Sequence, residues 1–168
     1  MRGILGVILC LPILFWGGLR IYKSVVYGID CGGHIKRAAD ANTVQLATQE
    51  LKTVIAYLER EGMTSGYTSI LYRTPDADVG FWYTNLKSCL EELEKITPET
   101  TQLERSNLLL KLRETLLDKG DSGESATEPP GISVYPNNVG YCFFGTLSTI
   151  LALVGAILFV TLIDWDWI

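Results

Sequence analysis

The feature that most constrains this chain is an uncharged hydrophobic stretch from Tyr141 to Ile163. At about 1.5 Å per residue, a helix over this stretch is roughly 35 Å long. The hydrocarbon core of a bilayer is about 30 Å thick, so such a helix can cross it with some tilt. We therefore predict a transmembrane helix over residues 141–163, followed by an interfacial tail over residues 164–168.

A second apolar segment lies at the start of the chain, from Gly3 to Leu19, with Pro12 near its middle. A cleaved signal peptide is the main alternative for this segment, because Arg2 precedes an apolar core. However, no small-x-small cleavage site follows, and the segment runs through Arg20 directly into further large residues. We therefore predict an uncleaved transmembrane helix over residues 3–22, kinked at Pro12, and a membrane protein with two spans.

The charges around the first segment bear on its orientation. Arg20, Lys23, Lys36 and Arg37 follow it, and the positive-inside rule places such a basic flank in the cytoplasm. The domain between the two spans is therefore predicted to be cytoplasmic. The alternative is an exoplasmic or periplasmic domain, because long domains can cross a membrane largely regardless of their charge. Arg2 before an apolar core also resembles an export signal.

Between the membrane segments, apolar residues recur at helical spacing. Val44, Leu51 and Leu58 are seven residues apart, which predicts a long amphipathic helix from His34 to Glu61. The preceding stretch Asp30-Cys31-Gly32-Gly33 is expected to interrupt the helical path, because paired glycines lower helix stability and permit unusual backbone angles.

Two further helices are predicted from matching start signals. Thr74-Pro75-Asp76 and Thr97-Pro98-Glu99 each supply a capping hydroxyl, a proline suited to the first turn and an acid near the positive end of the helix dipole. The third helix is expected to end near Asp118, and the short connection makes the second and third helices antiparallel neighbours. The predicted buried residues are Val79, Trp82, Leu86, Leu90, Leu93 and Ile96 in the second helix, and Leu103, Leu109, Leu110, Leu112, Leu116 and Leu117 in the third.

These patterns define an all-α fold class. Two transmembrane helices flank a small antiparallel helical bundle of about three helices over residues 34–118. The loop over residues 63–73 is rich in tyrosine and aliphatic side chains and is expected to fold over the bundle. Residues 119–140 are predicted to form a flexible acidic linker, because the first part is rich in glycine, serine, proline and acids. A membrane-proximal turn is expected at the end of this linker.

The sequence contains few groups that could support catalysis or bind a metal. His34 is the only histidine, and with Cys31 it would supply half of a structural zinc site, which usually needs four ligands. The acidic cluster over residues 91–94 has no histidine beside it, as a di-metal carboxylate bundle requires, and is expected to face solvent. We therefore predict a non-enzymatic protein without a metal or cofactor. Whether Cys31 and Cys89 pair is left open.

The leading functional prediction is a membrane-anchored interaction or scaffold module, or an accessory subunit of a membrane complex. The formal net charge of −5 argues against nucleic-acid binding, which usually requires a basic face. Small residues on the second span are expected to pack against Gly3, Gly6 and Cys10 of the first span, or against a second copy of the chain. These candidate packing residues are Gly145, Ser148, Ala152, Gly155 and Ala156. The expected partners are the lipid bilayer and another protein or a homo-oligomer.

The alternative prediction is a sensor or ligand-binding domain. Such a domain would recognise a small molecule or peptide between its helices and the 63–73 loop. Tyr67, Tyr72 and Trp82 are the candidate residues for this surface, because aromatic side chains commonly line ligand pockets. A roomy pocket beneath these three side chains would favour this alternative over the leading prediction.

Overall fold

A computed structural model describes residues 2–120 and 123–163, so the predicted interfacial tail over residues 164–168 lies outside the described residues. The chain divides into two compact units. One unit combines Met1–Ser24 with the chain from Asn137 onward, and we call it the membrane unit because it holds the two predicted spans; the other, the helical domain, is Val25–Pro136. The predicted all-α fold class is confirmed in outline, because helices dominate the described residues and the strands form a single two-stranded sheet.

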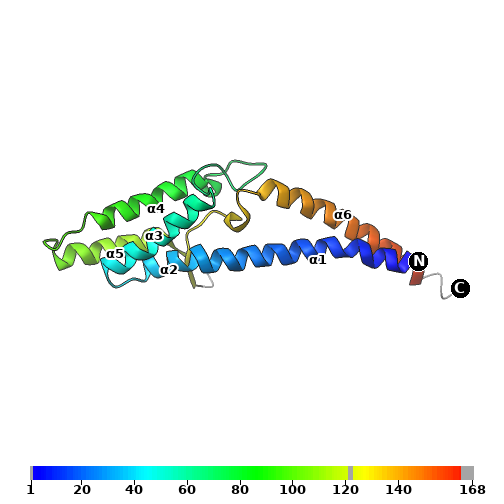
Figure 1. Ribbon diagram of the computed structural model, residues 1–168, viewed down its shortest axis with the longest axis horizontal. Helices are drawn as coiled ribbons and strands as arrows, with labels where there is room; N and C mark the ends of the chain where they lie inside the picture. Colours follow the sequence, from blue (N-terminus) through cyan, green and yellow to red (C-terminus); the bar gives the residue numbers. More distant parts are fainter. Residues whose placement is uncertain (1, 121–122, 164–168) are drawn as a thin grey trace. The chain divides into compact units, whose positions relative to one another are not determined.

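The membrane unit contains most of helix α1 (Arg2–Tyr27), up to Ser24, and all of α6 (Asn138–Ile163), and the two helices lie side by side in Figure 1. Both are long and apolar enough to cross a bilayer, with mean hydropathies of 2.1 and 2.3 over their most apolar windows. The two helices run antiparallel, because Gly6 lies against Gly155 while Trp16 lies against Gly145. Nε1 of Trp16 also donates a hydrogen bond to the carbonyl of Tyr141 over 2.8 Å.

The predicted interruption at residues 30–33 is wrong, because the chain stays helical there. A π-helix over Gly28–Gly32 joins α1 to α2 (Gly33–Ala39). The wider π turn brings the carbonyl of Gly28 next to Gly33, where an added Cβ would lie only 2.8 Å from that oxygen. The glycines therefore permit a local widening of the helix rather than its end.

The single helix predicted from His34 to Glu61 is divided in the structure. Helix α2 ends at Ala39, and α3 (Val44–Arg60) begins after Thr43, whose extended backbone places Oγ1 to accept from the amide of Leu46 over 3.3 Å. The seven-residue row of Val44, Leu51 and Leu58 is nevertheless buried along α3. The capping threonine thus starts a new helix that folds back on α2.

The predicted start of the next helix at Thr74 is also wrong. Residues Pro75–Ala77 form only a 3₁₀ turn, and Thr74 makes no side-chain capping bond. Helix α4 (Val79–Glu94) begins after Asp78, whose Oδ1 accepts from the amide of Phe81 over 2.9 Å. The carboxylate therefore supplies the acceptor that the prediction assigned to a threonine four residues earlier.

Helix α5 (Gln102–Leu116) starts four residues later than Thr97-Pro98 predicts. Thr101 and Glu104 form a capping box, in which each side chain accepts from the other residue's amide. Residues 95–101 form the turn between α4 and α5, and the two helices are antiparallel as predicted, because Lys111 of α5 reaches back to Glu92 of α4. Leu112 and Leu116 are buried, but Leu103 and Leu110 are exposed, contrary to the predicted apolar row.

Residues 119–140 differ from the prediction of a flexible linker. Strands β1 (Leu117–Gly120) and β2 (Gly123–Ala126) form an antiparallel hairpin, and a 3₁₀ turn over Ile132–Val134 follows. Ile132 is buried against the bundle, and the carbonyl of Thr127 accepts a 2.7 Å hydrogen bond from Trp82. Apolar and backbone contacts therefore hold this segment to the core despite its polar composition.

The core of the helical domain lies among α2, α3, α4 and α5, whose ribbons are grouped together in Figure 1 and whose buried side chains form one cluster. Its centre is formed by Ile35 of α2, Leu51 and Leu58 of α3, and Leu86 and Leu93 of α4. This core occupies one side of α3 and leaves the other side of that helix free to line a cleft.

Candidate functional site

A cleft of about 1280 Å³ runs along the outer side of α3. Its walls come mainly from α3, from the end of α4, from α5 and from the turn that joins α4 to α5, and the segment before α3 adds Asp30, His34, Asn42 and Thr43. All of these residues belong to the helical domain. The cleft is a large concave surface of this domain, and it is the candidate functional site.

The α3 wall is built by helical periodicity. Residues that face the core, such as Ala47, Leu51 and Val54, alternate with residues that face the cleft. The cleft residues of α3 are mostly polar and uncharged or weakly apolar: Val44, Gln45, Thr48, Gln49, Lys52, Thr53, Ala56, Tyr57 and Arg60. A helix of 17 residues with this pattern presents one continuous wall about 25 Å long.

The opposite wall is more apolar. Leu93 and Ile96 come from the end of α4 and the following turn, Pro98 from the same turn, and Leu109 from α5. Arg105 supports this wall, because its Nη2 donates to the carbonyls of Thr97 and Pro98, each over 2.9 Å. The cleft therefore offers a mostly polar α3 wall and an opposite wall on which these apolar side chains lie among polar ones such as Gln102 and Ser106.

An ion pair joins the two walls at one point. Nζ of Lys52 on α3 lies 2.8 Å from Oε1 of Glu94 on α4. Both side chains are about half exposed, at 58% and 46%, so this pair contributes little to stability and can open at small cost. A bound molecule could replace either partner of this pair without disturbing the core.

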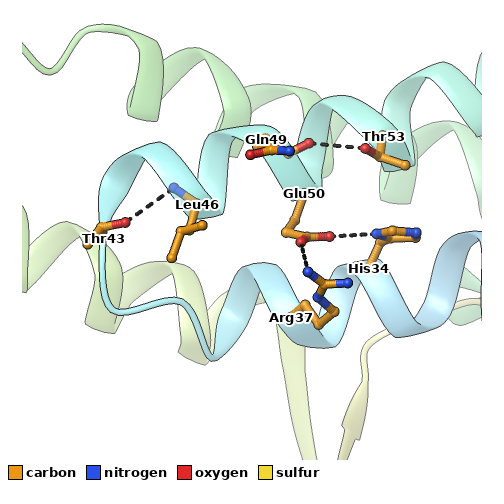
Figure 2. Close-up of polar contacts among 7 residues, drawn as sticks. All are labelled: His34, Arg37, Thr43, Leu46, Gln49, Glu50 and Thr53. Atoms are coloured by element: carbon orange, nitrogen blue, oxygen red, sulfur yellow. Dashed lines mark hydrogen bonds and ion pairs between the residues drawn. The ribbon is translucent and has the colours of Figure 1, made fainter.

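Behind the α3 wall, a buried carboxylate organises the contact between α2 and α3 (Figure 2). Glu50 is only 7% exposed, and its two oxygens lie 2.5 Å from Nδ1 of His34 and 2.6 Å from Nη2 of Arg37. A buried carboxylate is costly unless it is paired, so the two α2 side chains compensate for its desolvation. His34 also lines the cleft, and Glu50 therefore fixes the orientation of one cleft residue.

Tyr57 lies at the end of the cleft nearest the last turn of α3. Burial raises the pKa of its hydroxyl, and the nearby carboxylate of Glu61 raises that pKa further. Outside the cleft, Tyr83 donates a 2.7 Å hydrogen bond to Glu59, which raises the pKa of Tyr83 to about 12. Both tyrosines are therefore neutral hydrogen-bonding groups at physiological pH.

The three aromatic residues predicted for a ligand surface do not line this cleft. Trp82 is 7% exposed and packs in the core, and Tyr72 is 75% exposed on the 63–73 loop. Tyr67 pairs with Asp78 in an isolated β-bridge, and the guanidinium of Arg73 lies 5.5 Å from its ring. Tyr72 and Trp82 therefore do not share a surface, because one side chain is exposed and the other is buried. The cleft lies elsewhere in the domain.

The small residues predicted to pack in the membrane unit lie largely on one face of α6. Gly145, Ser148 and Gly155 are buried and Ala152 is half-buried, whereas Ala156 is exposed. Gly155 approaches the α1 backbone so closely that an added Cβ would lie 2.7 Å from the carbonyl of Gly6. Cys10 on α1 lies beside Ala152, with its Sγ 3.9 Å from the Ala152 carbonyl.

No group of three or more histidine, cysteine or acidic side chains that could hold a metal occurs within residues 2–120 and 123–163. The four cysteines are all free, which answers the open question of a Cys31–Cys89 pair: the structure does not form it. No protein-family model, curated protein or solved structure matches the chain. The function must therefore be argued from the geometry of the site.

Sequence reasoning missed the cleft residues because it identified only the apolar row of this helix and assigned no role to the polar side. The available signal was the recurrence of Thr48, Lys52 and Ala56 at four-residue spacing, in register with Gln45, Gln49 and Thr53. Short neutral side chains on that face are unusual for a solvated helix, which more often carries long charged residues. The pattern shows a distinct face but does not show what lies opposite it.

Proposed function

We propose that this chain is a membrane-anchored interaction module whose helical domain binds an extended segment of a partner protein in the α3 cleft. The observation that carries the proposal is the length and chemistry of the cleft. A wall of about 25 Å matches seven or eight extended residues at about 3.3 Å each. The polar α3 wall would pair with the backbone of such a segment, and the apolar side chains of the opposite wall would receive its apolar side chains.

A segment of protein fits this cleft better than a compact small molecule does. Pockets for small ligands usually enclose about 300–1000 Å³ and are mostly apolar. The α3 cleft is larger, at about 1280 Å³, and its α3 wall is rich in threonine and glutamine. We further propose that the module is non-catalytic, since its only histidine is held by Glu50 and no nucleophile of the cleft has a base within bonding distance among the contacts described.

The two long apolar helices anchor the module in this proposal, and the basic residues after the first segment support a cytoplasmic helical domain. The alternative is an exoplasmic or periplasmic domain. A cysteine in place of Lys95, an exposed residue of the α4–α5 turn, distinguishes the two. After lysis, a membrane-impermeant thiol reagent should label this variant more strongly than it labels the parent protein, which has only the native cysteines. In intact cells the variant should show no labelling above the parent, and such labelling would reverse the orientation.

Site-specific photo-crosslinking tests the cleft directly. A photoreactive amino acid in place of Thr53, which lines the cleft, should crosslink to a partner in cells, and mass spectrometry should identify that partner. The matched control position is Leu46, which is exposed on the same helix but does not line the cleft. Equal crosslinking from both positions would show that the cleft is not the binding surface.

A second stage uses the purified partner with the full chain in detergent. Ala56→Arg fills the cleft with a long charged side chain, while Leu46→Arg adds the same side chain outside it. Ala56→Arg should weaken binding at least about tenfold if the buried contact is worth roughly 1.4 kcal/mol. Leu46→Arg should leave the affinity unchanged. Unchanged affinity in both variants contradicts the proposed function.

A further inference from the structure

The loop over residues 63–73 presents an apolar tip that no other part of the helical domain covers. Ile70, Leu71 and Tyr72 are consecutive and are 43%, 84% and 75% exposed. A single exposed hydrophobic residue is ordinary, but three in succession at the end of a loop leave a contiguous apolar surface in water. Arg73 follows them and carries a positive charge.

The base of this loop is ordered by a set of backbone contacts. Tyr67 pairs with Asp78 in a β-bridge, and the Thr68 amide donates to the carbonyl of Ala77 over 2.9 Å. The Val79 amide donates to the carbonyl of Gly66, also over 2.9 Å. The loop tip is therefore a projection with a firm base, and its exposed side chains do not result from a freely moving segment.

The same loop base is held to the chain segment that enters the membrane unit. The hydroxyl of Tyr135 donates to the carbonyl of Ser65. Gly66 leaves room for this contact, because its φ is +96° and an added Cβ would lie 2.5 Å from the Tyr135 hydroxyl. Tyr135 is the second-last residue of the helical domain, and α6 begins at Asn138.

Chain length limits how far this loop base can lie from the apolar stretch of α6. Residues 135–138 span at most about 10 Å, at about 3.3–3.6 Å per residue. The three helical steps from Asn138 to Tyr141 add about 4.5 Å. Tyr135 therefore lies within about 15 Å of the residue where the predicted span begins, a distance comparable to the headgroup region plus a short margin.

We propose that Ile70, Leu71 and Tyr72 insert into the interface of the same bilayer that α6 crosses, as a third and shallow membrane contact. The chemistry fits a lipid surface: aliphatic side chains enter the acyl boundary, a tyrosine lies at the headgroup level, and Arg73 attracts anionic headgroups. This contact would fix the orientation of the α3 cleft relative to the membrane. It rests on the proposed membrane anchoring but not on partner binding in the cleft.

The test uses the full chain in nanodiscs of phosphatidylcholine with phosphatidylserine. An environment-sensitive fluorescent amino acid is placed at one of three exposed positions: Leu71 on the loop tip, Glu99 on the α4–α5 turn and Leu153 on α6. Glu99 is the water control because the 16 residues of α4 separate its turn from the 63–73 loop. Leu153 is the control for a lipid-facing position within the span.

Three quenchers then report the surroundings of each probe: a lipid with a nitroxide near its headgroup, a lipid with a nitroxide deep in its acyl chain, and aqueous iodide. At Leu71, the headgroup nitroxide should quench the probe strongly. Aqueous iodide should quench the probe at Leu71 much less than it quenches the probe at Glu99. At Leu153, nitroxide deep in the acyl chain should quench best. Equal iodide quenching at Leu71 and Glu99 would overturn the proposal.

Two further outcomes separate the possible explanations. Protection of Leu71 from iodide without quenching by either nitroxide lipid would mean that protein, such as a second copy of the chain, covers the loop, and it would also overturn the proposal. Iodide quenching at Leu153 would contradict membrane anchoring itself. If Leu153 behaves as expected but the probe at Leu71 is not quenched by the headgroup nitroxide, the loop contact is refuted and the membrane anchoring is not.

Discussion

Trp82→Ala gives the sharpest test of the domain core. Trp82 is 7% exposed, and a buried tryptophan removes about 200 Å² from water, which at about 25 cal/mol per Å² corresponds to roughly 5 kcal/mol. The extended-chain reference overstates this area, so about 3–5 kcal/mol is the expected loss of unfolding free energy. A loss of that size is a large part of the stability of an ordinary domain.

The indole N–H contributes separately. It donates to the carbonyl of Thr127 over 2.7 Å, and this bond holds the segment after β2 against α4. Trp82→Phe keeps most of the apolar contact and removes the donor, so it should cost about 1–2 kcal/mol. Phe81→Ala is the matched control, because Phe81 is adjacent but 65% exposed, and its loss should cost less than about 1 kcal/mol.

Pulse proteolysis of the full chain in detergent across a urea series measures these differences. The fraction of the helical domain that survives a brief protease exposure reports its folded population at each urea concentration. The expected order of destabilisation is Trp82→Ala, then Trp82→Phe, then Phe81→Ala. Equal midpoints for Trp82→Ala and Phe81→Ala would refute the assignment of Trp82 to the core, and a Trp82→Phe midpoint equal to that of the parent would refute the role of the Thr127 bond.

Three other predictions follow from particular contacts. Asp78→Ala and Thr101→Ala should each lower the unfolding free energy by about 1 kcal/mol in the same proteolysis assay, whereas Thr74→Ala should change it little, because Thr74 makes no capping bond. Burial raises the pKa of Glu128 above its ordinary value, although the Tyr27 hydroxyl that donates to it over 2.8 Å acts in the opposite direction. A raised pKa in the folded state stabilises the fold at low pH, and this contribution disappears as the pH rises through the raised value. The stability of Glu128→Gln relative to the parent should therefore increase as the pH rises above about 4.5, and a pH-independent difference would contradict the raised pKa. Gly155→Leu should reduce oxidative crosslinking between Cys10 and a cysteine in place of Ala152, because a side chain at Gly155 meets the Gly6 backbone, while Ala156→Leu on the exposed side should leave it unchanged. Equal crosslinking in the two leucine variants would show that α1 and α6 do not pack through this face.

The start of α4 shows why local signals alone can misplace a helix boundary. Thr74-Pro75 and Asp78 both offer a capping oxygen, and each is compatible with a following helix. The β-bridge between Asp78 and Tyr67 holds Asp78 in an extended conformation, and this conformation makes it the cap. Tyr67 lies eleven positions earlier, so a pattern read within one turn of helix cannot include its effect.

The hairpin after α5 shows a similar competition between composition and packing. Residues 119–131 have the glycine, serine and proline content of a linker. The buried side chain of Ile132 and the acceptor carbonyl of Thr127 nevertheless attach this segment to the core. A few apolar and backbone contacts therefore outweigh the average polarity of the segment.

The sequence by itself determined the features that depend on local periodicity and length. The uncharged run of residues 141–163 is long enough to cross a bilayer, and the spacing of Val44, Leu51 and Leu58 defines the buried face of α3, because both properties follow from helix geometry alone. Tertiary structure alone decided the burial of Glu50, since the two side chains that pair with it, His34 and Arg37, lie on α2 and reach it only after α2 and α3 fold back on each other. The cleft was decided in the same way: one wall is the polar face of α3, and the other comes from residues around Ile96 and Leu109, more than thirty positions after the end of α3. A concave surface needs two walls, and no local pattern specifies which distant segment supplies the second one.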